Sequence, residues 1–206
     1  MLFSLPGSEG SAGRGIPIAV TARIDEDISE VLRAIKLKAL QQDGSYLLAS
    51  GRRSNYFLDM KTVLNDGEVL RKIARLVLNR IPDEASAVGG LAMGSIPIST
   101  AVVLLSLESR PTKPLRGFWV RQDEKTHGLG GLISGDLRAT DRVVIVDDVT
   151  TSGKSVVRAF DAVKGTGATV LKVVAIVDRL EGAEQQLEHR GVTFESLFTR
   201  KDVLGS

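Results

Sequence analysis

The sequence predicts an α/β fold, with a mostly parallel central sheet flanked by helices. From residue 86 onward, short apolar runs alternate with amphipathic helical segments, and the runs lack a polar face, as expected of strands covered on both sides. Sheets of this kind bind their ligands beyond the carboxyl ends of the strands. A functional site is therefore expected in the loops that follow the apolar runs.

The N-terminal part of the chain predicts a tail, a helix and a hairpin. Residues 1–22 are expected to form a flexible tail, followed by a single domain over residues 23–206. Within residues 25–43, apolar side chains recur on one helical face. Two strand-like runs, residues 45–49 and 55–60, are separated by a spacing that suits a hairpin.

The remaining elements continue the alternation. Asn65 and Asp66 can cap a helix that ends before Pro82. Further strands are expected at residues 86–90, 115–120, 142–149 and 169–177, with helices at residues 97–107 and 153–163.

Length and composition exclude several classes of protein. The 206 residues suit one domain, and 27 basic against 25 acidic residues give a net charge of +2, too small for the field of a nucleic-acid binder. The absence of cysteine excludes a disulfide scaffold, a thiolate zinc site and a cysteine nucleophile, and it fits a cytoplasmic location. Residues 85–107 carry no charge, but glycines and Pro97 interrupt the run, so a membrane span is not expected.

A phosphate-binding loop is predicted after the strand at residues 142–149. The apolar run Val143–Val146 leads into Asp147 and Asp148, then into a loop of small and hydroxyl residues, and then into a helix. Hydroxyls and free N–H groups at a helix start suit a phosphate monoester, and Gly153 allows a close approach of the backbone. The loop consists of Val149, Thr150, Thr151, Ser152, Gly153, Lys154 and Ser155.

The two acids favour a sugar phosphate over a nucleoside triphosphate as the ligand. The nucleotide P-loop pattern requires a glycine five positions before Gly153, where this chain has Asp148, and an acid there would repel a triphosphate. Adjacent acids at a strand end can face ribose hydroxyls or help to hold a magnesium ion through water. Either acid alone would more simply cap the helix, but acids, hydroxyls and glycine together indicate a site.

Residues 143–155 closely resemble the phosphoribosyl-pyrophosphate (PRPP) binding motif of type I phosphoribosyltransferases. The resemblance implies the fold of that family, a mostly parallel central sheet flanked by helices with a small N-terminal hood. It also implies that Asp147 and Asp148 meet the ribose hydroxyls. Residues 149–155 would complete the PRPP site, with the 5′-phosphate held at residues 151–155.

A second resemblance lies in the polar, glycine-rich segment 121–131, which directly follows an apolar strand and is expected to move. Cations on a mobile loop suit closure over an anionic leaving group, because they stabilise developing charge while water is excluded. The segment is similar to the catalytic loop of orotate phosphoribosyltransferases, and the matching residues are Arg121, Lys125, His127, Gly128, Gly130 and Gly131. This implies that Arg121, Lys125 and His127 bind PRPP and act in catalysis together with Asp147 and Asp148.

Two further segments are similar to the orotate-binding parts of that family. Residues 50–57 resemble its hood segment, which places the hood at about residues 25–62 and the core at residues 63–206. Asp178 and Arg179 resemble its orotate-contacting pair, and a guanidinium suits an anionic base because it can meet a carboxylate or two carbonyls. The residues implied to bind orotate are Thr151, Arg179 and Phe57.

Three lysines of well-known bacterial members are missing at the matching positions, which are Ala49, Gly94 and Gln122. We hypothesise that Lys61 or Arg53 supplies a replacement cation. An unchanged Michaelis constant for orotate in both Lys61→Ala and Arg53→Ala would contradict this.

The resemblance implies transfer of the phosphoribosyl group from PRPP to orotate, giving orotidine 5′-monophosphate and pyrophosphate in pyrimidine (UMP) biosynthesis. Magnesium is the expected cofactor, held mainly by PRPP and not directly by the protein. The expected assembly is a homodimer without a nucleic-acid or membrane partner. In it the mobile segment 121–131 acts as a lid that is shared across subunits. Two alternatives stay open: a phosphoribosyltransferase for another nucleobase, such as adenine or uracil, and a non-catalytic PRPP-sensing regulator.

Overall fold

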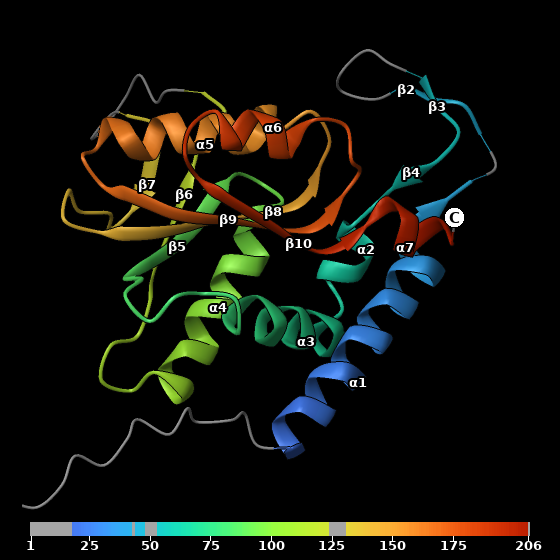
Figure 1. The fold of residues 1–206 in the computed structure, drawn as a ribbon, viewed down its shortest axis with the longest axis horizontal. Coiled ribbons are helices and arrows are strands. Elements are labelled where there is room, and N and C mark those ends of the chain that lie inside the picture. The colour runs from blue at the N-terminus through green and yellow to red at the C-terminus, as the bar shows by residue number, and fades with distance from the viewer. Residues whose placement is uncertain (1–17, 43, 48–52, 124–130, 206) are drawn as a thin grey trace, which may run out of the picture.

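A six-stranded sheet between two helical layers forms the centre of the computed structural model, which describes residues 18–42, 44–47, 53–123 and 131–205 (Figure 1). The strand order is β10-β9-β8-β5-β6-β7. The pairs β10–β9, β9–β8, β8–β5 and β5–β6 are parallel, and β7 is antiparallel to β6. The mostly parallel sheet predicted from the sequence is therefore confirmed.

The predicted core elements are present, with ends that differ by a few residues, and the core has further elements that were not predicted, at residues 133–135, 183–188, 193–199 and 200–204. In chain order they are α3 (Gly67–Leu78), β5 (Ala87–Leu91), α4 (Ser95–Ser109), β6 (Arg116–Val120), β7 (Ile133–Gly135), β8 (Arg142–Thr150), α5 (Lys154–Gly165), β9 (Thr169–Asp178), α6 (Ala183–Glu188), β10 (Thr193–Thr199) and α7 (Arg200–Leu204). Asp66 caps α3 as predicted, because its carboxylate accepts hydrogen bonds from the backbone N–H groups of Glu68 and Val69. Asn65 instead ends the short helix α2 (Lys61–Leu64).

The two faces of β8 belong to two separate apolar cores. Val144 and Val146 pack in a cluster with residues of α3 and α4, whereas Val143 and Ile145 pack in a cluster with residues of α5 and α6. Successive residues of a strand point to opposite faces of the sheet, so this run fills both cores. Figure 1 shows the corresponding layers, with α5 and α6 on one face of the sheet and α3 and α4 on the other. The two helical layers hold β8 in the middle of the sheet, so its carboxyl end lies near the centre of the sheet edge at which the parallel strands end.

The N-terminal helix differs from the prediction at both ends. Helix α1 spans Ile18–Ala34 and continues as the π-helical segment η1 (Ile35–Ala39), so residues 18–22 belong to a helix instead of the tail. It ends before residue 43 because β1 (Leu40–Gln41) pairs with β4 (Phe57–Leu58). The buried carboxylate of Asp27 accepts two hydrogen bonds, of 2.8 and 2.6 Å, from the Arg75 guanidinium, which joins α1 to α3.

The hood is built from two short strand pairs. β2 (Tyr46–Leu47) pairs antiparallel with β3 (Arg53–Ser54), so a hairpin is present, but its second strand precedes residues 55–60, where it was predicted. The predicted strand at residues 55–60 is only partly correct, because the paired residues are those of β4, which leaves the hairpin to join β1. Within the described residues, none of the helices has both the length and the apolar character needed to cross a membrane.

Candidate active site

Several of the predicted site residues, Asp147, Asp148, the loop 149–155 and Arg179, lie at the carboxyl edge of the sheet, around the end of β8. The strand order places β8 between β9 and β5. Arg179 follows the end of β9 on one side, and residues 92–94 follow the end of β5 on the other. The loop between β8 and α5 lies between them, in the position expected for ligand binding by an open parallel sheet.

The two adjacent acids line two different pockets. Asp147, which is 5% exposed, lines a pocket of about 80 Å³ together with residues 149–155. Asp148 lines a second pocket, of about 340 Å³, together with Lys61 and Gly94. Consecutive residues at the end of a strand point to opposite sides, which explains this division. A ligand that contacts both carboxylates would extend from one pocket toward the other.

Burial perturbs the ionisation of both acids. Desolvation raises the pKa of Asp147 well above its ordinary value, and the neighbouring charge of Asp148 raises it further. Desolvation also raises the pKa of Asp148, against the effects of a hydrogen bond from the Val149 N–H at 2.9 Å and of the positive charge of Lys61. The Oδ2 atom of Asp147 is buried, and none of the described residues donates a hydrogen bond to it. Such a pair is suited to accept hydrogen bonds from ligand hydroxyls or from the water ligands of a cation.

The loop after the acids has the geometry of an anion site. Gly153 immediately precedes α5 with φ of +82°, and a Cβ at this position would lie 3.0 Å from the Cα of Ala183. The left-handed conformation and the close approach both require glycine. Thr151 and Ser152 are half-buried in the small pocket, and Lys154 and Ser155 are exposed at its helical side. The start of a long helix directs unpaired N–H groups toward this pocket.

The predicted loop residues Thr150 and Val149 also have structural contacts. The Thr150 hydroxyl, which is buried, donates to Oδ1 of Asp178 at 3.2 Å, and its carbonyl accepts from the Arg179 N–H. The same Asp178 oxygen accepts from the Leu180 N–H at 3.0 Å. Asp178 therefore ties the phosphate loop to the end of β9, and the backbone of Val149 holds Asp148.

Arg179 joins the core to the hood. Its guanidinium is buried, donates to Ser54 Oγ and to Glu181 Oε1, each at 3.0 Å, and lies 4.2 Å from the centroid of the Tyr56 ring. The sequence indicated Arg179 but not the roles of Ser54, Tyr56 and Glu181. The signal for the first two was their position in the hood segment beside Phe57, and for Glu181 its spacing of two residues from Arg179. No local sequence pattern indicates that Ser54 and Tyr56, which lie far from Arg179 in the chain, contact its guanidinium.

Phe57 lies in the hood, with 38% of its surface exposed. Its ring stacks on Tyr46, with 5.8 Å between centroids. Thr151, the third residue implied to bind orotate, lines the phosphate pocket instead. The structure thus distributes these three residues over the hood, the end of β9 and the phosphate loop.

The described part of the predicted lid begins beside the loop that follows β5. Gln122 Nε2 donates to the Ala92 carbonyl at 3.3 Å, and Arg121 Nη1 donates to the Gly131 carbonyl at 3.3 Å. The predicted lid residues Lys125, His127, Gly128 and Gly130 lie outside the described residues, as does Ala49.

Gly94 approaches the acid pair closely. A Cβ at this position would lie 2.4 Å from Oδ1 of Asp148. A larger residue here would therefore require the side chain of Asp148 to shift. Because position 94 carries no side chain in this chain, a cation at this side of the acid pair comes from another segment.

The acid pair fits a cation only as part of a larger ligand shell. Within the described ranges, no three carboxylate or imidazole side chains converge as a metal site. Asp147 and Asp148 supply carboxylate oxygens, which magnesium prefers, but too few to complete its coordination. These residues therefore suit a magnesium ion whose other ligands are water and substrate oxygens.

The raised pKa values predict an unusual dependence of stability on pH. A carboxyl group whose pKa is raised by folding keeps its proton at a pH at which the unfolded chain has lost it, so stability falls as the pH rises through that window. Asp147→Asn removes this effect. The difference in unfolding midpoint, variant minus wild type, is therefore expected to increase as the pH rises from 4 to 8.

Asp202 provides a control of opposite sign. Hydrogen bonds from the Thr199 N–H and hydroxyl lower its pKa, so its contribution to stability is present above the ordinary value and lost as the pH falls. Asp202→Asn should thus lose stability relative to the wild type as the pH rises from 3. Parallel slopes for the two variants in thermal denaturation would contradict the assignment of the raised pKa to Asp147.

Comparison with known proteins gives consistent matches. Residues 59–200 match the family model described as the phosphoribosyl transferase domain. Orotate phosphoribosyltransferase of Methanocaldococcus jannaschii is 37% identical over 175 residues, which cover 85% of this chain and 96% of the relative. The same enzyme of Methanothermobacter thermautotrophicus is 39% identical over 173 residues, which cover 84% and 92%.

A solved structure agrees with these matches. The crystal structure of Mycobacterium tuberculosis orotate phosphoribosyltransferase in complex with PRPP superposes with a TM-score of 0.70 at 28% identity. The superposition covers 86% of this chain and 98% of that chain. Sequence and fold therefore point to the same relatives.

Proposed function

This chain belongs to the phosphoribosyltransferase family, and we propose that it transfers the phosphoribosyl group of PRPP to orotate, giving orotidine 5′-monophosphate and pyrophosphate. The observation that carries the proposal is the acid pair at the end of β8, with a phosphate loop on one side and a second pocket on the other. PRPP has a matching order of groups: a 5′-phosphate, two ribose hydroxyls and a pyrophosphate. The reaction belongs to pyrimidine biosynthesis.

Chemistry at C1 of the ribose determines what the protein must supply. N1 of orotate forms a bond to C1 and loses its proton, while the C1–O bond breaks and its electron pair leaves with pyrophosphate. The residues named here do not bond to the sugar, so catalysis consists of positioning and electrostatic stabilisation. We assign the 5′-phosphate to residues 151–155, the ribose hydroxyls to Asp147 and Asp148, and the leaving group to the lid.

Lid cations complete this assignment. Arg121, Lys125 and His127 would stabilise the charge that develops on pyrophosphate and exclude water from the activated sugar. Magnesium, when bound, would neutralise part of the negative charge of PRPP, and Asp147 and Asp148 are the residues that would face it. The buried and unpaired Oδ2 of Asp147 supports this placement.

For the base, we propose that Arg179, Thr151 and Phe57 bind orotate. Arg179 uses two N–H donors on Ser54 and Glu181. A guanidinium has five, so these contacts do not exhaust its capacity to bind an anionic base. Because the same residue holds the hood, base binding and hood position are coupled in this assignment.

We further propose that the protein is a cytoplasmic homodimer whose lid reaches the neighbouring site. Leu104 and Leu107 of α4 are 61% and 56% exposed, and large apolar side chains on one exposed helix suit an interface between copies. If sites are shared, chains with a defective lid and chains with a defective PRPP site should complement each other. Mixing Lys125→Ala with Asp148→Asn is expected to restore turnover that neither variant shows alone. The absence of turnover in verified heterodimers would exclude a shared site.

The absence of lysine at Gly94 and Gln122 favours one alternative, a phosphoribosyltransferase for another base. Pyrophosphate release with orotate, adenine, hypoxanthine and uracil at equal concentrations distinguishes the two. The proposal predicts release with orotate. A faster release with another base would keep the PRPP site and overturn the base assignment.

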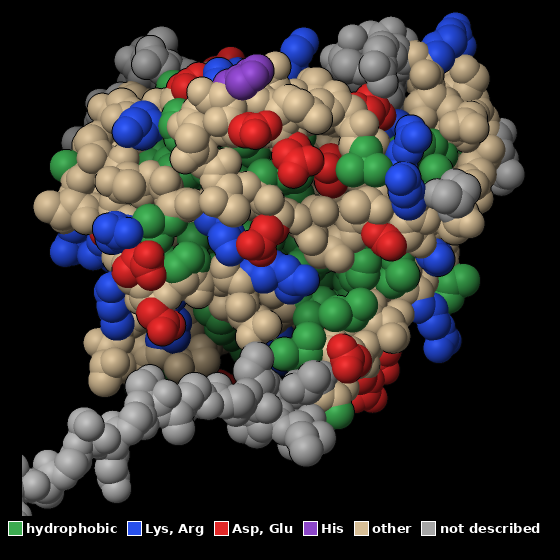
Figure 2. Space-filling view, in the orientation of Figure 1, with side chains coloured by type: hydrophobic (Ala, Val, Ile, Leu, Met, Phe, Trp, Pro, Cys, Tyr) green, Lys and Arg blue, Asp and Glu red, His purple; other side chains and the backbone are tan. Residues whose placement is uncertain are grey.

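A PRPP-sensing regulator is the other alternative, and it would need a basic surface for nucleic acid. Figure 2 shows basic and acidic side chains interspersed on the face that it presents, without a large field of one sign. Tight, salt-dependent binding of nucleic acid without turnover of any base would favour the regulator.

A further inference from the structure

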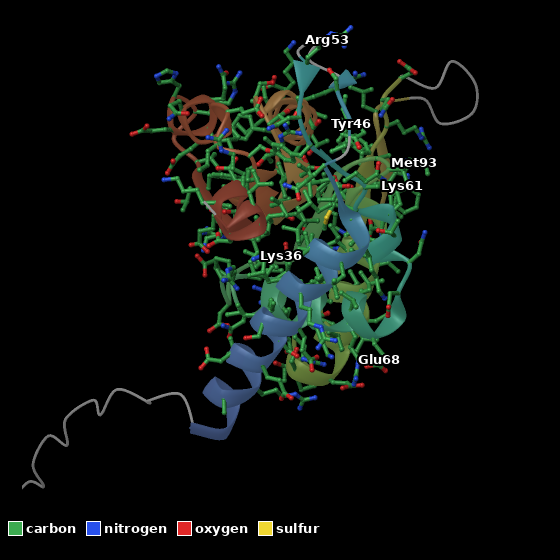
Figure 3. All side chains as sticks on the ribbon, turned by 90° about the vertical axis from the view of Figure 1, so that its right-hand side faces the viewer. Lys36, Tyr46, Arg53, Lys61, Glu68 and Met93 are labelled. Carbon is green, nitrogen blue, oxygen red and sulfur yellow. The ribbon has the colours of Figure 1, made fainter. Side chains whose placement is uncertain are left out.

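The pocket beside Asp148 contains a cation whose role the proposed function leaves unassigned. Lys61 begins α2, directly after the hood, and it lines this pocket with Met93 and Gly94 from the loop after β5. Figure 3 shows Lys61 next to Met93, whereas Arg53 lies at the far tip of the hood. Arg53 donates to Ser45 there and is not among the described residues that line the pocket beside Asp148.

Lys61 is the single basic residue among the described residues that line the pocket. The two positions on this side where related enzymes carry a lysine supply no positive charge here. Gly94 has no side chain, and Gln122 is neutral and hydrogen bonded to Ala92. Any anion that enters this pocket would therefore meet the ammonium group of Lys61.

The ammonium group of Lys61 is available for a ligand. Its side chain is exposed, and none of the carboxylates in the described ranges forms a salt bridge with it. Lys61 lines the same pocket as Asp148, and its positive charge acts to lower the pKa of that carboxyl group. A lysine is a mobile point charge on a flexible stem, which suits a phosphate group that enters and leaves during turnover.

The strand order indicates which part of the substrate lies here. Arg179 and the hood residue Ser54 that it contacts lie on the β9 side of the acid pair, where the proposed function places the base. The pocket of Lys61 and the first residues of the lid occupy the β5 side. Base and leaving group lie on opposite faces of C1 in a displacement, so the leaving group belongs on the β5 side.

Resting on the proposed function, we propose that Lys61 binds the pyrophosphate group of PRPP and replaces the cation that position 94 lacks. Lys61 would contact the leaving group directly. It would thus discriminate PRPP from sugar phosphates that lack pyrophosphate.

Calorimetric binding of PRPP and of ribose 5-phosphate, both with magnesium, tests this assignment on the full-length protein. Lys61→Met keeps the length of the side chain and removes the charge. Its affinity for PRPP is expected to fall about tenfold, as for the loss of a hydrogen bond to a charged group, while its affinity for ribose 5-phosphate stays within about twofold. Lys61→Arg should recover most of the PRPP affinity.

Lys164→Met is the matched control, because Lys164 is an exposed lysine in the last turn of α5. It should bind both ligands as the wild type does, and thermal unfolding should show that both variants are folded. Equal losses for the two ligands in Lys61→Met, or an unchanged affinity for PRPP, would overturn the assignment.

Steady-state kinetics separates this inference from the proposed function. Lys61→Met should raise the Michaelis constant for PRPP, and that for pyrophosphate in the reverse reaction, while that for orotate stays unchanged. This differs from the effect on orotate that the sequence led us to expect, because the pocket of Lys61 lies on the leaving-group side of the acid pair. An increase for orotate alone would place Lys61 at the base and contradict the inference. If the wild type binds PRPP but turns over no orotate, the base assignment fails while the calorimetric result still decides the role of Lys61.

Discussion

Replacing Asp148 by asparagine is expected to lower kcat/KM for PRPP by about 10- to 100-fold, the loss typical of removing a charge-assisted hydrogen bond. Asparagine has the same shape, so it should occupy the space beside Gly94 without disturbing the loop. What it removes is the negative charge that we assign to a ribose hydroxyl and to the solvated cation. Initial rates at varied PRPP concentration measure the effect.

Asp161→Asn is the control, since Asp161 is an exposed acid on α5 outside the two pockets at the acid pair. It should leave kcat/KM unchanged. An Asp148→Asn variant with kcat/KM within about twofold of the wild type would show that the Asp148 carboxylate does not contact the substrate.

Gly153→Val is expected to raise the Michaelis constant for PRPP by about 100-fold. A β-branched residue is strained at positive φ, by about 1–2 kcal/mol, and its Cβ would collide with the Cα of Ala183. Relief of this strain requires the loop to move, which turns the N–H groups at the start of α5 away from the phosphate. Kinetics at varied PRPP concentration and thermal unfolding should both respond.

Gly191→Val is the control that separates the effect of backbone strain from an effect on the phosphate loop. Gly191 also has positive φ, of +67°, but a Cβ there meets no atom within 4 Å. This variant should lose stability with an unchanged Michaelis constant for PRPP. If the two variants have the same Michaelis constant, the phosphate loop does not act as we assign it.

The sequence predicted the structure of the loop between β8 and α5 well because its signals are local. A buried strand, two acids, a glycine and a helix start follow one another in residues 143–155, so the neighbouring elements alone place the loop at the edge of the sheet. The same holds for the cap of α3, where Asp66 bonds to residues two and three positions away. Such features depend on backbone geometry within a few residues.

Contacts between distant segments could not be predicted in this way. Arg179 and Ser54 are 125 residues apart in the chain, and no pattern in either segment indicates that they bond. The steric conflict between Gly94 and Asp148 is similar, because glycine at position 94 is explained by a residue of another strand. The division of the two acids between two pockets likewise becomes visible only when the loops of β5 and β8 are assembled.

Edge elements were missed for a different reason. β7 and β10 are the two outer strands of the sheet, and their residues are half-buried, with apolar and polar types mixed. A strand covered on fewer sides needs fewer apolar residues, which weakens its signal in the sequence. The start of α1 at Ile18 was missed because residues 18–22 lie next to a segment rich in glycine and serine.

The loss of orotate absorbance after addition of PRPP and magnesium tests the central claim most directly, in the wild type and in Lys125→Ala. We expect the wild type to consume orotate only when PRPP and magnesium are both present, with one pyrophosphate released for each orotate. The same assay of Lys125→Ala should show almost no turnover. Unchanged orotate absorbance in the wild type, with PRPP bound and another base consumed, would contradict the claim that orotate is the substrate.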